Sequence, residues 1–596
     1  MTDACNASTN SRDIAERALA ERLATFKLAA DAAPESIWIE RGSAIRGAAN
    51  QTPAEQRNKS LANLLFAVKD NIDVAGYPTT AACAEFAYQP TRSATVVQRL
   101  LDAGAVAVGK TNLDQFACGL VGTRSPFGAV QNAFDPRYIS GGSSSGSAVA
   151  VALGLVDFAL GTDTAGSGRV PAGLNNIVGL KPSRGLLSTS GVVPACAHLD
   201  CPSIFARTVP QAVKVLLAAA AHDAADPFSR ALALDTRAFP RQFRFGIPDR
   251  RHLRFFDDDA AETAFSSACE RLQALDGTST SIDYTPFAEA ASALYEDAWV
   301  AERYAAIQPF FDARPEAVNP VVRTIIESGK RYCAAQLFQA MARMAALRQR
   351  AAQLWESVDV LVVPTAPTVY TIAQVEANPV ELNRRLGLYT NAVNLLDLAA
   401  IAVPSSMRPD GLPFGITLIG PAGSDLRLAE LAARYHAASG LSLGVSREPV
   451  PAPAAWPRPV GSTVRVAVVG AHLDGLPLNG QLRERGAHFI KRARTAPHYR
   501  FHALANTVPP KPGLVRMSAD GASIEAEIWE MPVAAFGSFV PLVPAPLCIG
   551  TIDLDDGSTV QGFLCEAAAL DGATDITRYG GWRAYLSSLE PRDAPD

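Results

Sequence analysis

SGGSSSGSAVAVALGLVDFALGTDTAGSGRVP, residues 140–171, is the stretch that decides the fold of this chain. Two loops rich in serine and glycine enclose a run of small residues at 148–153 and a strand-like apolar run at 156–160. Because glycine has no Cβ and tolerates positive φ, such loops let the backbone approach a ligand closely, and their N–H groups can stabilise an anion. This layout is suited to placing two hydroxyl groups at one point.

Length and charge limit the classes of function. A chain of 596 residues with 48% apolar residues is too long for one hydrophobic core, so at least two globular domains are expected. Its 54 basic and 59 acidic residues form no long run of one sign, which argues against a nucleic-acid partner and favours a small-molecule substrate. The sequence has no signal-peptide pattern at its start and no window of about 18 apolar residues, so we expect a cytoplasmic protein with no membrane partner.

The cysteines indicate neither a disulfide framework nor a metal centre. There are nine, an odd number, and none forms a CxxC pair, which favours reduced thiols. Cys196, His198 and Cys201 form a cluster that resembles a metal site, but no fourth ligand lies nearby in the sequence. We therefore expect no metal and no cofactor, with these residues buried or packing a loop.

The order of the predicted elements indicates the fold class. Apolar strand candidates at 64–69, 105–109, 358–364, 398–404 and 413–419 alternate with helical patterns, the last of them at 425–438. This alternation predicts an α/β fold, in which helices cover both faces of a sheet. Long helical periods between about 260 and 355 indicate a helical insertion. Prolines crowd residues 449–459 and predict a stiff spacer, which divides the chain into a domain at 1–445, a linker at 446–462 and a smaller β-rich domain at 463–590.

The candidate nucleophile needs a base, because a serine hydroxyl attacks well only when its proton is removed. All eight histidines lie at or after position 198, outside the serine/glycine loops, which leaves a distant histidine as one alternative. Lys69 ends an apolar strand, where burial would lower its pKa enough for it to serve as the base. A serine/glycine loop alone is more often a turn or a phosphate cradle, but no GxxxxGK[ST] motif is present.

Four blocks carry a family resemblance: FAVKDNIDVAG at 66–76, VGKTNLDQFACG at 108–119, SGGSSSGSAVA at 140–150 and GTDTAGSGRVPA at 161–172. In this order they resemble the amidase signature hydrolases, over about residues 60–440. The resemblance implies a mixed sheet covered by helices and amide hydrolysis by a Ser-Ser-Lys triad. It implies that Lys69 is the base, Ser143 the bridging serine after a cis peptide bond, and Ser167 the nucleophile.

The same resemblance assigns the residues around the nucleophile. Backbone N–H groups of Thr164, Ala165 and Gly166, with that of Ser167, would form the oxyanion hole. Asp163 and Arg169 flank the nucleophile and are expected to pair and hold its loop. The chain departs from the usual family pattern at Ser145 and at Ala165, where many members have glycine. Ala165 adds a Cβ beside the expected position of the scissile carbonyl.

The predicted insertion contains a second resemblance. Residues 295–304, YEDAWVAERY, resemble a block of the allophanate hydrolases, the amidase signature members that act on carboxylated urea. Tyr295 and Arg303 are eight positions apart, about two turns of one helix, so they would share a face and could hold a small carboxylate. The alternative is a surface helix on which Arg303 pairs with Asp297 or Glu302.

The second domain resembles the same family. VVGAHLDGLPLNG, residues 468–480, is similar to the opening of the C-terminal domain of allophanate hydrolases, which is related to gamma-glutamyl cyclotransferases. The resemblance makes His472 the candidate for decarboxylation of the first product, N-carboxycarbamate. The alternatives are a histidine that packs the end of the first strand and a domain that acts mainly in assembly.

Together these resemblances predict hydrolysis of allophanate (urea-1-carboxylate) to ammonia and carbon dioxide, in nitrogen catabolism of the urea or s-triazine type. The sequence has no biotin-attachment MKM, so a separate biotin-dependent urea carboxylase or a biuret-forming pathway would supply the substrate. A homodimer is the usual form in the family. The rival predictions are a general aliphatic or aryl amidase with the same triad and a component of a transamidation complex.

Overall fold

The computed structural model describes residues 2–42, 59–452 and 463–589. The chain forms two compact units, residues 1–235 with 239–457 and residues 236–238 with 458–596. The predicted linker falls mostly on residues 453–462, outside the described part. None of the helices that the structure describes is both long enough and apolar enough to cross a bilayer.

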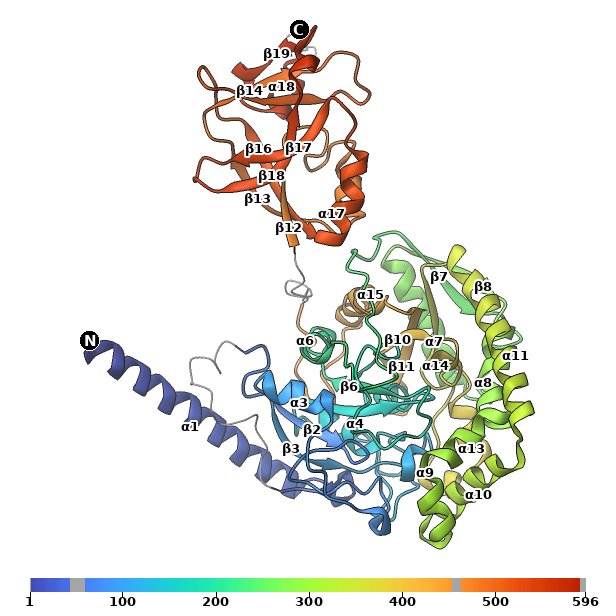
Figure 1. Ribbon diagram of the computed structural model, residues 1–596. Helices are drawn as coiled ribbons and strands as arrows, with labels where there is room; N and C mark the ends of the chain where they lie inside the picture. Colours follow the sequence, from blue (N-terminus) through green and yellow to red (C-terminus); the bar gives the residue numbers. More distant parts are fainter. Residues whose placement is uncertain (1, 43–58, 453–462, 590–596) are drawn as a thin grey trace. The chain divides into compact units, whose positions relative to one another are not determined.

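A mixed sheet of eleven strands forms the centre of the first unit (Figure 1). Its spatial order is β1-β3-β2-β4-β6-β5-β10-β11-β9-β7-β8. The strands are β1 (Trp38–Glu40), β2 (Leu65–Lys69), β3 (Val106–Thr111), β4 (Phe158–Asp163), β5 (Val178–Lys181), β6 (Cys201–Ala206), β7 (Phe243–Pro248), β8 (Gly277–Ile282), β9 (Val360–Pro364), β10 (Leu398–Met407) and β11 (Pro413–Pro421). β2 is parallel to both of its neighbours, whereas β10 is antiparallel to both of its own.

Helices cover both faces of this sheet, as the sequence predicts. They are α1 (Thr2–Ala32), α3 (Thr95–Asp102), α4 (Ser145–Ala152), α5 (Val170–Leu174), α6 (Val209–Ala219), α7 (Asp259–Ala274), α8 (Thr285–Glu296), α9 (Ala301–Ala313), α10 (Pro320–Ser328), α11 (Ala334–Ala352), α12 (Ile372–Ala377), α13 (Glu381–Leu386), α14 (Ala392–Leu395) and α15 (Asp425–Ala438). One apolar core joins α3, α6, α7 and α15 to the sheet, and others join α4, α5, α8 and α11 to it. The predicted fold class is thus confirmed.

The alternation of side chains along β2 explains how the sheet presents the candidate base. Phe66 and Val68 pack into the core that contains α3 and α6, while Leu65 and Ala67 pack on the side of α4. By the same alternation Lys69, the last residue of the strand, lies on the α4 side. Because β2 and β4 are parallel neighbours, the loops that follow them meet at the same edge of the sheet.

Two strands of this sheet have no counterpart among the elements predicted from the sequence. β7 was not expected, and β8 interrupts the predicted helical insertion. β8 reads GTSTSI, is mostly polar and exposed, and lies at the edge of the sheet. An edge strand with a solvent face has no apolar run, so the helical patterns on either side of it masked its presence.

The second unit is rich in β-structure and has its own core. A five-stranded sheet has the order β13-β16-β12-β18-β17, and a three-stranded sheet has the order β15-β14-β19. The elements are β12 (Thr463–Val468), α16 (Asn479–Arg483), β13 (His488–Arg494), β14 (Tyr499–Ala503), β15 (Pro512–Arg516), β16 (Glu525–Pro532), α17 (Val533–Phe539), β17 (Leu547–Asp553), β18 (Thr559–Cys565), β19 (Thr574–Asp575) and α18 (Trp582–Leu589). Trp529, Tyr499 and Phe501 fill its interior.

Candidate active site

Lys69 and Ser143 meet in the interior of the first unit. The Lys69 Nζ donates to Ser143 Oγ at 2.8 Å and to Thr162 Oγ1 at 2.7 Å. Both residues of the Lys69–Ser143 pair have no exposed surface. Ser143 precedes α4, and the Gly142–Ser143 peptide bond is cis, as the family resemblance implies. The structure therefore brings together two of the three predicted triad members.

The surroundings of Lys69 favour its neutral form. Burial lowers the pKa of its amine to about 7, and the negative charges of Asp114, Asp200 and Asp163 only partly oppose this effect. A lysine with this pKa is substantially neutral near pH 7, so its nitrogen has a lone pair that can accept a proton. Lys69 thus has the two properties that a general base needs: a neutral form and a hydroxyl within hydrogen-bond distance.

Ser167 lies in the loop between β4 and α5 and is 2% exposed. Its hydroxyl donates to the Gly119 carbonyl at 3.5 Å, which is long for a hydrogen bond between two oxygens. Within the part of the chain that the structure describes, no hydrogen bond joins the Ser167 and Ser143 hydroxyls. Catalytic hydrogen bonds are often long or misaligned without substrate and shorten in the complex.

A buried ion pair supports the Ser167 loop. Asp163 and Arg169 have no exposed surface and form two hydrogen bonds, each of 2.9 Å. Burial alone would raise the pKa of Asp163, but the Arg169 guanidinium outweighs it and holds that pKa below its usual value. Asp163 also accepts from the N–H groups of Gly166 at 2.9 Å and Gly168 at 3.0 Å. The pair therefore fixes the backbone on both sides of Ser167.

The Gly166 contact changes the predicted oxyanion hole. Its N–H already donates to Asp163, so it is engaged within the protein. Thr164 and Ala165 remain the donors of the predicted set, with the N–H of Ser167 itself. Ala165 packs among apolar residues that include Cys196 and Leu199, so its Cβ contributes to the wall of the site.

Two further residues hold this site, although their places in the sequence alone did not indicate a role there. Thr162 is the second hydrogen-bond partner of Lys69, and the parallel pairing of β2 with β4 is the signal that could have revealed it. Asp114 accepts from the N–H groups of Val121, Gly122 and Arg124 at 2.9–3.1 Å, and its own N–H donates to the Ser143 carbonyl. Asp114 thereby joins the Ser143 loop to the segment that contains Gly119.

Tyr295 and Arg303 also meet, but not for the predicted reason. They lie on two different helices, because α8 ends at Glu296 and Asp297 has an extended backbone before α9 begins at Ala301. The helical spacing used for the prediction is therefore wrong. The turn between the helices brings the residues together: Arg303 Nη2 lies 3.2 Å from the Tyr295 hydroxyl, and the guanidinium carbon lies 5.1 Å from the centre of the ring.

Arg303 is a buried cation with unused hydrogen-bond donors. It is 3% exposed, and within the described residues its Nε and Nη1 have no hydrogen-bond partner. The partners that the alternative interpretation named are engaged elsewhere, since Asp297 pairs with Arg343 and Glu302 with His198. A buried guanidinium with two free donors is suited to binding an anion in two-pronged geometry.

The cysteine cluster does not gather around a common point. The His198 ring is exposed and contacts Glu302, whereas the Cys201 thiol is buried near Lys181 and Asn394. Among the described residues, Asp249, His252 and Asp283 form the one group whose atoms could share a metal ion, and they lie apart from the predicted cluster.

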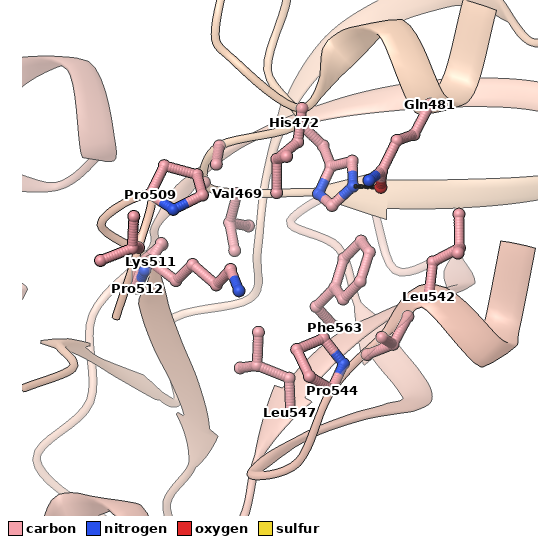
Figure 2. Close-up of a pocket in the computed structure, with 15 residues that line it drawn as sticks. Val469, His472, Gln481, Pro509, Lys511, Pro512, Leu542, Pro544, Leu547 and Phe563 are labelled. Atoms are coloured by element: carbon pink, nitrogen blue, oxygen red, sulfur yellow. Dashed lines mark hydrogen bonds between the residues drawn. The ribbon is translucent and has the colours of Figure 1, made fainter. Parts of the chain in front are cut away.

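In the second unit, His472 lines a cavity of about 260 Å³ (Figure 2). Its Nε2 lies 3.0 Å from Gln481 Oε1, and its ring stacks on Phe563 with a centroid separation of 5.1 Å. Burial lowers the pKa of His472, and the nearby positive charge of Lys511 adds to this effect, so the ring is neutral near pH 7. The Lys511 side chain extends into the same cavity, as Figure 2 shows.

Comparison with known families covers both units. The amidase family model matches residues 17–429, and the model named allophanate hydrolase C-terminal domain matches residues 464–587. The first match alone takes in more than half of the chain.

Individual relatives agree with these matches. The chain is 45% identical to a urea amidolyase of Saccharomyces cerevisiae over 89% of its own length, but it spans about a third of that longer relative, 30%. It is 32% identical to the amidase-like component of a glutamyl-tRNA(Gln) amidotransferase of Synechococcus sp., over 73% of this chain and 95% of that one. The solved structure of Kluyveromyces lactis allophanate hydrolase superposes with a TM-score of 0.85 at 39% identity and covers 96% of this chain and 97% of its own. The chain therefore belongs to the amidase family of amide-hydrolysing enzymes, and its second unit is an allophanate hydrolase C-terminal domain.

Proposed function

We propose that this protein hydrolyses allophanate, a urea that carries a carboxylate on one nitrogen, by a Ser-Ser-Lys mechanism. Neutral Lys69 accepts the Ser143 proton while Ser143 accepts the proton of Ser167, whose oxygen attacks the terminal amide carbonyl. Collapse of the tetrahedral intermediate breaks the C–N bond, and the proton returns along the same route so that ammonia leaves. Water then cleaves the Ser167 acyl-enzyme and releases N-carboxycarbamate. The N–H groups of Thr164, Ala165 and Ser167 stabilise the oxyanion in both steps.

The observation that carries the substrate assignment is the unpartnered Arg303 guanidinium. A neutral amide has no group that requires a buried cation, whereas allophanate has a carboxylate at the end opposite its reactive amide. Within the described residues Arg303 Nε and Nη1 have no partner, so each can donate to one carboxylate oxygen, and the Tyr295 hydroxyl, beside Nη2, adds a further donor. The similarity to Kluyveromyces lactis allophanate hydrolase over both units supports the same assignment.

The two rivals have less support. A general aliphatic or aryl amidase would use the same Lys69–Ser143 pair but leave Arg303 without a ligand. A role in transamidation is supported by the similarity to the glutamyl-tRNA(Gln) amidotransferase component, but that similarity covers 95% of the relative and only 73% of this chain. Such a relative offers no counterpart for a second unit of the size found here.

Ammonia release from allophanate and from malonamide tests the proposal. Ser167→Ala is expected to abolish release from both substrates. Arg303→Ala is expected to raise KM or lower kcat for allophanate at least about a hundredfold while affecting malonamide little, because it removes a charge-assisted pair of hydrogen bonds. Arg343→Ala is the matched control, since Arg343 pairs with Asp297 at the surface of the same helical region. Equal losses on the two substrates would remove the carboxylate assignment and favour the general amidase.

For the second unit we propose that His472 promotes loss of CO2 from N-carboxycarbamate. Its position in a cavity beside Lys511 supports this role, because a cation there can hold one carboxylate of a small dianion. Its ring contacts with Phe563 and Phe539 favour the packing alternative. With ¹³C-labelled allophanate followed by NMR, His472→Ala should accumulate N-carboxycarbamate, whereas a packing role alone predicts no accumulation in a folded variant.

The wider setting is also part of the proposal. An enzyme that carboxylates urea, or a pathway that forms biuret, would supply allophanate. The similarity to a urea amidolyase of which this chain covers only 30% supports the link to urea carboxylation. We further propose that the protein works in the cytoplasm as a homodimer, and gel filtration with light scattering can test the dimer.

A further inference from the structure

Residues 195–201 form a segment that contacts both the nucleophile loop and the helix of Arg303. The segment leads into β6, and Ala195, Cys196 and Asp200 are buried in it. The side chain of His198, by contrast, is 69% exposed. The segment therefore has a buried side toward the Ser167 loop and an outer side toward α9.

Asp200 makes the contact on the buried side. One of its carboxylate oxygens accepts from the Thr164 hydroxyl, and the other accepts from the N–H groups of Ala195 at 2.8 Å and Cys196 at 3.1 Å. Burial raises the pKa of Asp200 to about 6, so it is a carboxylate that accepts hydrogen bonds at neutral pH. Asp200 thus fixes the side chain of Thr164, whose backbone N–H is a candidate oxyanion donor, to the backbone of the segment.

Glu302 makes the contact on the outer side. Its Oε1 lies 2.8 Å from the backbone nitrogen of His198 and 2.7 Å from the Nδ1 of the same residue. Glu302 directly precedes Arg303 in the first turn of α9, and consecutive helical residues point about 100° apart. Glu302 can therefore bind the segment while Arg303 points into the site.

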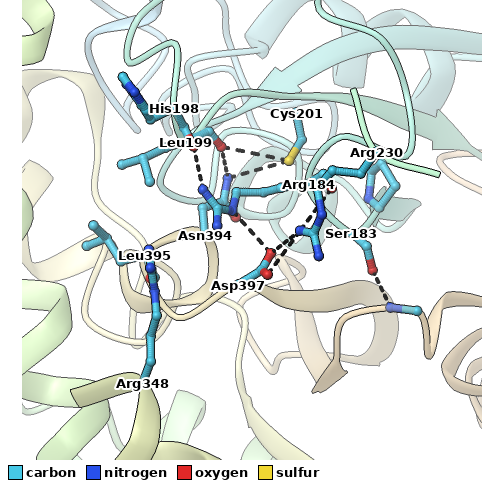
Figure 3. Close-up of polar contacts among 12 residues, drawn as sticks. Ser183, Arg184, His198, Leu199, Cys201, Arg230, Arg348, Asn394, Leu395 and Asp397 are labelled. Atoms are coloured by element: carbon cyan, nitrogen blue, oxygen red, sulfur yellow. Dashed lines mark hydrogen bonds and ion pairs between the residues drawn. The ribbon is translucent and has the colours of Figure 1, made fainter. Parts of the chain in front are cut away.

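Further hydrogen bonds hold the middle of the segment (Figure 3). Asn394 Nδ2 donates to the Leu199 carbonyl at 2.8 Å and to the Asp163 carbonyl at 2.6 Å, which joins the segment to the end of β4. The Arg184 guanidinium donates to the His198 carbonyl and also pairs with Asp397. A segment bound at this many points moves as one body.

We propose that Glu302 and Asp200 are positioning residues that couple the placement of Arg303 to the oxyanion loop through residues 195–201. The inference rests on the proposed role of Arg303 as the ligand of the substrate carboxylate. A substrate that binds Arg303 settles the first turn of α9; through Glu302 this settles the segment, and through Asp200 it places Thr164. Binding energy from the non-reacting end of the substrate is in this way used to raise kcat, and not only to lower KM.

Steady-state kinetics of Glu302→Ala with allophanate and malonamide test the coupling. We expect kcat for allophanate to fall about tenfold, the usual size of coupling along a packed network, while kcat for malonamide stays within about twofold. Glu302→Gln keeps an oxygen that can accept from the His198 N–H and should recover most of the loss. Glu289→Ala, which breaks a surface pair with Arg350 on the neighbouring helices, is the control and should match the wild type.

A double-mutant cycle separates coupling from a merely structural role. In an Arg303→Ala background, Glu302→Ala should cost allophanate turnover less than about twofold, because the two residues act on one path. Asp200→Asn, with its fold checked by circular dichroism, should lower kcat for both substrates, since it acts next to the oxyanion loop. Unchanged allophanate kinetics in Glu302→Ala, equal losses on both substrates, or additive losses with Arg303→Ala would each overturn the coupling. If instead wild-type protein fails to turn over allophanate, or Arg303→Ala affects both substrates equally, it is the proposed function that fails.

Discussion

Lys69 Nζ lies 2.8 Å from Ser143 Oγ in an interior that leaves neither residue any exposed surface. The two come from different parts of the chain, the end of β2 and the loop before α4, and the parallel pairing of β2 with β4 brings the lysine to the edge where the serine loops lie. Burial and hydroxyl partners together convert an ordinary cation into a group that can exchange a proton near neutral pH.

The pH dependence of the reaction should follow Lys69. Since burial lowers its pKa to about 7 and only the neutral amine accepts a proton, kcat/KM for allophanate should rise as the pH increases through about 7 and then level off. Lys69→Arg should be inactive, because a guanidinium does not lose its proton. A pH–rate profile of the wild type and assays of the variant check both points. A profile that is flat across this range contradicts the assignment of Lys69 as the base.

The same pKa predicts how stability depends on pH. The unfolded chain holds the Lys69 proton up to a pKa of about 10.5, whereas the folded protein releases it at about 7. Between these values the unfolded state binds more protons, so the cost of burying Lys69 decreases as the pH rises from about 7 toward 10.5. Lys69→Met has no such cost. Its advantage in thermal unfolding temperature over the wild type should therefore be largest near pH 7 and shrink near pH 9; an advantage that grows with pH would contradict this.

Thr162 should contribute to the reactivity of Lys69. Thr162→Val keeps the shape of the side chain but removes the oxygen that lies 2.7 Å from Nζ. A hydrogen bond to a charged group is worth about 1.5–3 kcal/mol, so kcat/KM near neutral pH should fall about tenfold or more. Thr162→Ser, which retains the hydroxyl, is the matched variant and should stay within about threefold. Loss of activity in both variants would point to packing instead of the hydrogen bond.

The Asp163–Arg169 pair should dominate the stability of the nucleophile loop. Arg169→Met leaves the Asp163 carboxylate buried without its partner, which typically costs about 3–5 kcal/mol. Arg350→Ala breaks a half-exposed pair with Glu289 and should cost about 0–1 kcal/mol. Calorimetric unfolding of both variants measures the difference. Similar small losses in the two would show that Asp163 is satisfied by the Gly166 and Gly168 N–H groups alone.

Much of the fold could be predicted from local sequence patterns. The strand at 64–69 and the helix at 425–438 appear as β2 and α15 almost residue for residue, because each has a clear apolar period with polar boundaries. β7 and β8 could not be found in this way. The exposed side chains of β8 give no apolar period, and its place is decided by parallel pairing with β7.

The site divides along the same line. The residues of the serine/glycine loops and Lys69 could be named from the sequence, since glycine, serine and a strand-terminal lysine carry their chemistry in their identity and spacing. The supporting residues could not, because each acts through a partner that only the packing of distant segments supplies; they are Thr162, Asp114, Asp200 and Asn394. Tyr295 and Arg303 show the difference most clearly. Their residue types indicated a carboxylate site, but the helical spacing offered as the reason was wrong: a break at Asp297 and the burial of Arg303 bring them together.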